Sequence, residues 1–215
     1  DAVVTITNTA NGEERINEIY GESVVIIPYV MPGFDLAKEV VKIFSEQSSE
    51  KTEGMILMNH GIFTFGNSAK ESYDRMIKLV SKAEDYLMTH SAWEIKISEI
   101  PETHSIQVSE IAELRQKVSN VAGKPMLLHI TNSKSGLSFS NNKHVQSIAT
   151  RGPVTPDHVI RTKRIPMIGR DIDSFKNEYV SYFKSNEPNA KDRKTMLDPS
   201  PRVLLDKELG LCSIG

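Results

Sequence analysis

The sequence predicts a layered α/β protein, and three observations carry this prediction. Apolar runs typical of strands alternate with helical patterns through the first part of the chain. Residues 69–90 repeat apolar side chains at the spacing of one helix face, namely Tyr73, Met76, Ile77, Val80, Ala83 and Leu87. Polar or glycine-containing stretches, such as residues 48–54, separate these segments as loops.

The elements of the first half follow from local patterns. Residues 3–7 favour a strand, because Val3, Val4 and Ile6 are β-branched. Residues 14–20 fit a short helix, and residues 23–30 fit an apolar strand that a proline interrupts. After the Pro32-Gly33 turn, Leu36, Val40, Ile43 and Phe44 recur at helical spacing. Residues 55–58 and 62–66 read as two strands joined by the Asn59-His60-Gly61 turn.

The second half has a different character. Residues 91–107 read as a connector, followed by a helix that carries Val108, Ile111, Leu114, Val118 and Val121. Residues 124–132 favour a strand, residues 133–142 a polar turn region and residues 173–183 a helix. A loop then leads to a closing strand. We therefore expect a core domain over residues 1–92 and an α+β extension over residues 93–215, which could pack on the same core.

Composition excludes several function classes. The 215 residues carry a formal net charge of −2, which gives no bulk attraction for nucleic acid or an anionic membrane. The one cysteine, Cys212, cannot form an internal disulfide, so a reducing, cytoplasmic setting is the simplest expectation. No apolar run approaches the roughly 18 residues of a membrane-spanning helix. The chain opens directly on a β-type run without Met, and we expect the natural protein to extend beyond it.

The turn around His60 has two interpretations. Asn and Gly are common turn residues, so a histidine between them can be an ordinary turn residue. Alternatively, His60 is a metal ligand that two strands hold in a fixed direction, with Gly61 leaving room for a substrate. A catalytic Zn²⁺ site needs about three protein ligands and an open position, and local sequence alone supplies one imidazole.

Residues 55–87, MILMNHGIFTFGNSAKESYDRMIKLVSKAEDYL, resemble the class II aldolase/adducin family, as do residues 24–40. Residues 151–168 and 195–211 look like the later part of one branch, in which the aldolase is fused or related to a short-chain dehydrogenase in proteins that handle rhamnulose 1-phosphate. The resemblance implies a three-layer α/β/α domain with a mixed, largely antiparallel central sheet. The resemblance covers most of the chain, namely the later part of the aldolase core and the α+β extension that follows it.

The resemblance also implies a function. Family members use a divalent metal, usually Zn²⁺, as a Lewis acid for retro-aldol cleavage of a ketose phosphate, with a carboxylate as acid/base. On this basis His60 is the third metal-binding histidine, and Asn59 and Gly61 lie at the substrate. The His-x-His pair and the catalytic carboxylate are expected upstream of Asp1. Family members often form tetramers, so we expect a homo-oligomer.

The stretch TPDHVIRTKR, residues 155–164, is a second candidate site. His158, Arg161 and Lys163 could recognise a phosphate, because Arg offers a planar fork and Lys a point charge. The alternative is structural: Thr155-Pro156 is an ordinary helix start, and the RTKR residues are a solvated basic patch.

Three function classes therefore compete. The first is a metal-dependent aldolase acting on a phosphorylated ketose such as rhamnulose 1-phosphate, with a related sugar-phosphate epimerase also open. The second is a non-catalytic, adducin-like domain for oligomerisation or binding. The third is nucleic-acid binding through RTKR, which the acidic balance and the lack of interleaved aromatic residues disfavour.

Overall fold

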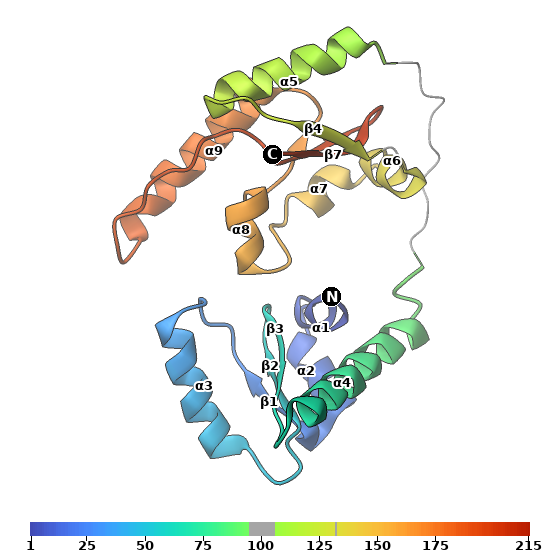
Figure 1. The fold of residues 1–215 in the computed structure, drawn as a ribbon, viewed down its shortest axis with the longest axis vertical. Coiled ribbons are helices and arrows are strands. Elements are labelled where there is room, and N and C mark those ends of the chain that lie inside the picture. Colours follow the sequence, from blue (N-terminus) through green and yellow to red (C-terminus); the bar gives the residue numbers. More distant parts are fainter. Residues whose placement is uncertain (95–105, 132) are drawn as a thin grey trace. The chain divides into compact units, whose positions relative to one another are not determined.

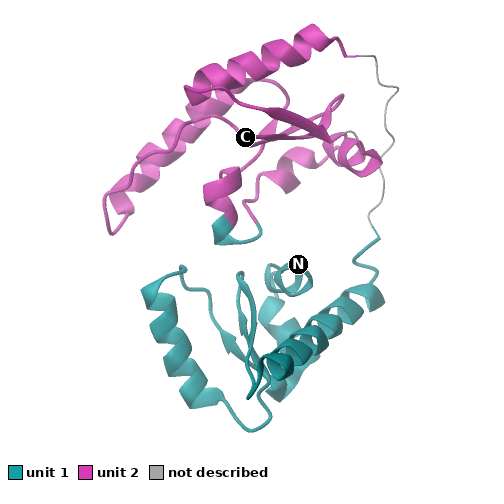
Figure 2. Cartoon of the chain, in the orientation of Figure 1, with its two compact units in different colours: residues 1–95, 154–157 teal, residues 96–153, 158–215 magenta. Residues whose placement is uncertain are grey.

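The computed structural model describes residues 1–94, 106–131 and 133–215 (Figure 1). The chain forms two compact units (Figure 2). Unit 1 contains Asp1–Ile95 together with Val154–Asp157, and unit 2 contains Lys96–Pro153 and His158–Gly215. Each unit has its own mixed sheet and its own helices, which confirms the predicted α/β class.

Unit 1 is built on a three-stranded sheet in the order β1-β2-β3. Strand β1 (Val24–Ile27) runs parallel to β2 (Gly54–Leu57), and β3 (Gly61–Thr64) runs antiparallel to β2. The helices are α1 (Ala2–Thr7), α2 (Gly12–Tyr20), the 3₁₀ turn η1 (Gly21–Ser23), α3 (Phe34–Gln47) and α4 (Ala69–Thr89). The predicted helices and strands after residue 13 of this half are thus confirmed, within a few residues at their ends.

The alternation of side chains along the strands gives unit 1 three layers. Val24 and Ile56 face a core shared with α1, α2 and α4, where Leu79 and Ala83 are completely buried. Val25, Ile27 and Leu57 point to the opposite face and pack against α3, through Leu36 and Ile43. Both faces of the sheet are therefore covered by helices, as the resemblance implied.

Residues 3–7 form a helix, so the predicted strand is wrong. Five of the six residues of α1 are buried, and Ala2, Val3 and Ile6 share the core with α4. These positions lie on one face of a helix, whereas a strand would point successive residues in opposite directions. Burial against α2 and α4 therefore outweighs the β preference of Val3, Val4 and Ile6.

Unit 2 contains a four-stranded sheet in the order β4-β7-β6-β5. Its strands are β4 (Leu128–Thr131), β5 (Met167–Ile168), β6 (Val203–Asp206) and β7 (Gly210–Ile214); only β5 and β6 pair in parallel. Its helices are α5 (Val108–Ala122), α6 (Lys134–Ser140), α7 (Val145–Ala149), α8 (Pro156–Thr162), α9 (Ile172–Asn186) and the 3₁₀ turn η2 (Glu187–Asn189). The first residues of α8 belong to unit 1.

The predictions for this half have mixed outcomes. The helices at α5 and α9 and the strand at β4 are confirmed. The polar turn predicted for residues 133–142 is wrong, because α6 forms there. Ser133 Oγ accepts a hydrogen bond from the Gly136 amide at 3.1 Å and caps this helix, while Leu137 is buried. The closing strand is a hairpin of β6 and β7. Most of the connector predicted at residues 91–107 lies outside the described residues.

Helices α5 and α9 pack on the sheet of unit 2 through a single apolar core. Its members include Leu114, Phe175, Leu204 and Cys212. Cys212 is fully buried, and burial raises the pKa of its thiol to about 11.

In unit 1, by contrast, Trp93 follows α4 and is 53% exposed. Among the described residues, no helix has the length and apolar character needed to cross a membrane.

An ion pair between the buried Asp206 and the partly exposed Arg170 closes the end of the β6–β7 hairpin. The Arg170 guanidinium donates to both carboxylate oxygens of Asp206, at 2.8 and 2.9 Å. The amides of Glu208 and Leu209 also donate to Asp206, each at 2.9 Å. Burial alone would raise the pKa of this carboxyl, but these hydrogen bonds outweigh it and hold the pKa below its usual value.

This pair predicts an acid-sensitive unit 2. A carboxyl whose pKa is lowered by folding contributes stability above its unfolded pKa of about 3.9, and that stability is lost as the pH falls toward the folded pKa. We expect Asp206→Asn to lower the free energy of unfolding at pH 7 by about 2 kcal/mol, because Arg170 is partly exposed and keeps Glu208 as a partner. It should also flatten the pH dependence below about pH 4. Urea unfolding at several pH values measures both effects.

The control is Asp192→Asn, because the Asp192 side chain is 86% exposed. An equal loss of stability in both variants would show that the Arg170–Asp206 pair contributes no more to the free energy of unfolding than an exposed carboxylate does.

Candidate functional site

The turn between β2 and β3 holds His60 in a constrained backbone. Leu57 and Gly61 are paired across the two strands, and the His60 amide donates to the Leu57 carbonyl at 3.0 Å. Asn59 has a φ of 59° and Gly61 a φ of 154°, both in the region that most side chains avoid. Asn and Gly tolerate this region better than other residues. The Asn-His-Gly sequence therefore matches the backbone that the turn requires.

The end of α1 fixes this turn from outside the sheet. Thr7 Oγ1 accepts a hydrogen bond from the Asn59 amide at 3.2 Å, and the Asn59 side-chain amide donates to Asn8 Oδ1 at 3.0 Å. Asn8 in turn donates to the Val4 carbonyl at 2.8 Å. On the sheet side, the Met58 amide donates to the Ile27 carbonyl at 2.9 Å. Asn59 thus positions the turn through Asn8.

The imidazole of His60 is largely enclosed. Its side chain is 23% exposed, and its Nδ1 is buried with no hydrogen-bond partner among the described residues. Its Nε2 lies 4.0 Å from Oδ2 of Asp157, a residue of the 154–157 segment that belongs to unit 1. This separation is too long for a direct hydrogen bond.

His60 suits the role of one metal ligand, but the described residues offer no full set. Nδ1 is buried, so Nε2 is the ring nitrogen that could bind an ion. In most metal-binding histidines the other nitrogen has a polar partner, whereas Nδ1 of His60 has none among the described residues. Within residues 1–94, 106–131 and 133–215, however, no three side chains of His, Cys, Asp or Glu are grouped to hold a metal ion. A metal at His60 therefore requires further ligands.

The second candidate stretch is divided between surface and interior. His158 and Arg161 are exposed on α8, as phosphate recognition would need. Lys163 is only 3% exposed: its ammonium donates to the Asp198 carbonyl and lies 4.5 Å from the centre of the Tyr179 ring. Burial lowers the pKa of Lys163. The placement of Lys163 thus does not favour the predicted substrate contact. All three lie in unit 2, and a role for them beside His60 stays a prediction.

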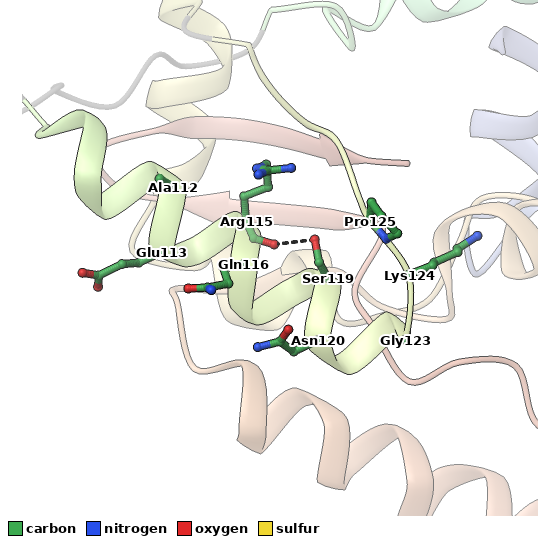
Figure 3. Close-up of a pocket in the computed structure, with 9 residues that line it drawn as sticks. All are labelled: Ala112, Glu113, Arg115, Gln116, Ser119, Asn120, Gly123, Lys124 and Pro125. Atoms are coloured by element: carbon green, nitrogen blue, oxygen red, sulfur yellow. Dashed lines mark hydrogen bonds between the residues drawn. The ribbon is translucent and has the colours of Figure 1, made fainter.

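Unit 2 also has a surface hollow of about 690 Å³ along α5 and residues 123–125, which the sequence did not predict. Figure 3 shows the Arg115 and Glu113 side chains pointing away from each other. The Ser119 hydroxyl is used within the helix, where it donates to the Arg115 carbonyl at 2.8 Å (Figure 3). Because its polar groups do not converge on one point, the hollow does not resemble a small-molecule site.

Sequence reasoning missed the residues that position His60. The sequence predicts a strand at Thr7 and a turn or helix start from Asn8, so neither residue is expected to contact residue 59. Asp157 was noted only as part of a charged stretch. The available signal in the sequence is Thr7 and Asn8, two polar residues that directly follow the apolar run of residues 2–6.

Comparisons with known proteins give a consistent result for both halves of the chain. The family described as Class II Aldolase and Adducin N-terminal domain matches residues 2–87, and the one described as Aldolase class II, second domain, matches residues 105–215. A relative from Bacillus subtilis (strain 168), named Uncharacterized oxidoreductase YuxG, is 26% identical over 239 residues. That match covers 100% of this chain and 34% of the relative, so the chain spans about a third of it.

Among solved structures, the N-terminal class II aldolase domain of a conserved protein from Thermoplasma acidophilum is similar. It is 45% identical, with a TM-score of 0.36, over 40% of this chain and 38% of that chain.

The contact between Thr7 and the turn gives a testable expectation. Replacing Thr7 by Val keeps its shape and removes the acceptor for the Asn59 amide. We expect a loss of about 1–2 kcal/mol in the free energy of unfolding, because a partly buried N–H is left without a partner. Amide hydrogen exchange at Asn59 should also become faster, and NMR can follow both changes.

Thr5→Val is the matched control, since Thr5 lies on the same helix and is exposed. If both variants lose the same stability and Asn59 exchanges at the same rate in both, α1 does not hold the turn through Thr7.

Proposed function

Since the chain belongs to the class II aldolase family, we propose that it takes part in metal-dependent retro-aldol cleavage of a phosphorylated ketose, such as rhamnulose 1-phosphate. Two family domains support aldolase-type function for this chain. The observation that carries the finer proposal is His60: an enclosed imidazole on a turn that α1 and the sheet hold in place, with Nε2 4.0 Å from Asp157 Oδ2 and thus in no direct hydrogen bond with it. An imidazole nitrogen without a direct hydrogen bond, on a ring that is fixed in direction, is suited to bind a cation.

In this proposal the cation is Zn²⁺ or another divalent ion, and when bound it supplies Lewis-acid polarisation of the ketose oxygens. His60 contributes one ligand, and the expected His-x-His pair and the acid/base carboxylate come from outside the described residues. Asn59 holds the turn, and Gly61 leaves space, because no heavy atom outside residues 60–62 lies within 4 Å of where a Cβ would stand. His158 and Arg161 are the candidates for the substrate phosphate.

Further parts of the proposal concern the intact protein. We infer a homo-oligomer in the cytoplasm, with Cys212 buried and reduced. The narrower resemblance to proteins fused to a short-chain dehydrogenase is compatible with the name of the oxidoreductase relative, two thirds of which lie outside the match. A sugar-phosphate epimerase would use the same ligand at His60.

A non-catalytic, adducin-like binding domain is the second candidate. The observation that favours it is that, within the described residues, no three side chains of His, Cys, Asp or Glu are grouped to hold a metal ion. Metal content separates the two candidates, because a binding domain needs no cation at His60.

We expect the natural full-length protein to bind about one divalent ion per chain, and His60→Ala to lose it. Elemental analysis after dialysis measures the metal, and cleavage of rhamnulose 1-phosphate measures the activity. A catalytic role predicts a fall in activity of at least about 100-fold, since an incomplete coordination set cannot hold the ion.

His129→Ala is the control, because His129 is exposed on β4 in unit 2. Stoichiometric metal that persists in His60→Ala would contradict the proposal, and a protein without any metal would favour the binding domain.

A further inference from the structure

One short segment of the second family region packs with the first unit. Residues 154–157 lie within the match to the second-domain family, which covers residues 105–215. By their contacts, however, they belong to unit 1 (Figure 2). The segment includes Thr155, Pro156 and Asp157, the first residues of the TPDHVIRTKR stretch, to which the proposed function gives no role.

Hydrogen bonds connect the segment to the turn that carries His60. The Asn59 side chain donates to Asn8 Oδ1 at 3.0 Å, and the Asn8 side chain donates to the Val154 carbonyl at 3.1 Å. Asn8 is therefore shared between the turn and the segment. Its side-chain oxygen accepts from the turn and its side-chain nitrogen donates to the segment, so the turn and the segment are both positioned by Asn8.

This arrangement places a carboxylate beside the imidazole. Oδ2 of Asp157 is 4.0 Å from Nε2 of His60, the ring nitrogen opposite the buried Nδ1. The Asp157 side chain is 73% exposed, so its oxygens are open to a ligand. In a tetrahedral site two bonds of about 2.0–2.2 Å each hold their donor atoms roughly 3.4 Å apart, so a shift of about 0.6 Å in the exposed Asp157 side chain brings both donors to one ion. Imidazole nitrogen with carboxylate oxygen is a common donor pair for divalent ions.

We propose that Asp157 supplies a carboxylate ligand to the divalent cation that His60 binds. The inference rests on the proposed function, because it requires a cation at His60, and it deepens that function by assigning a ligand to the second family region. The start of α8 then has a role in the site around the turn, and metal binding accounts for Asp157 in the TPDHVIRTKR stretch.

Titration with Mn²⁺ tests this proposal on the natural full-length protein, with free Mn²⁺ followed by electron paramagnetic resonance. We expect Asp157→Asn to raise the Kd for Mn²⁺ at least about tenfold, since loss of a group that supports the metal typically weakens binding by 10–100-fold. Asp157→Glu keeps a carboxylate and should recover part of the affinity. Asp157 is exposed, so neither variant should unfold the protein.

Asp173→Asn is the matched control, because Asp173 is also an exposed acidic residue in the first turn of a helix, but lies in unit 2. Its Kd should equal that of the unchanged protein. If Asp157→Asn also binds with unchanged Kd while His60→Ala does not bind, this inference is overturned and the proposed function stands. If the unchanged protein binds no Mn²⁺, both fail.

Discussion

A six-residue helix determines where His60 stands, and that helix depends on burial by distant parts of the chain. A helix as short as α1 is unstable by itself in water, because too few hydrogen bonds offset the cost of its first turn. Five of its six residues are buried, mostly against α2 and α4. Through Thr7 and Asn8, α1 then fixes the β2–β3 turn. The direction of the imidazole is thus set by apolar packing, transmitted through two polar side chains.

The fold class and the longer elements could be predicted from the sequence, because their periodicity directly reflects burial on one face. Helix α4 and the strands around His60 are clear examples. Helix α1 could not be predicted this way, since its β-branched residues favour a strand until α4 is known to cover them. Helix α6 was hidden for a related reason: serine and glycine suggest a turn, and only the cap at Ser133 and the burial of Leu137 show a helix.

The candidate site shows the limits of reading charge from sequence. In the RTKR stretch, Lys163 and Arg164 lie over the rings of Tyr179 and Tyr182, at 4.5 and 4.9 Å from their centres. These cations therefore serve packing within unit 2, although the sequence alone suggested a phosphate site. His60 could be singled out only because a short motif resembled a known family. Its contacts with α1 depend on residues some fifty positions away, and no local pattern encodes them.

The chain carries one tryptophan and one cysteine, and the fold places them in different units. Trp93 is half exposed at the end of α4, and Cys212 is fully buried in the sheet of unit 2. Each unit therefore has a natural reporter of its own: indole fluorescence for unit 1 and thiol labelling for unit 2. Because burial keeps the thiol protonated and shielded, labelling can occur only when unit 2 opens. The order in which the two units unfold can therefore be followed without introducing a new residue as a probe.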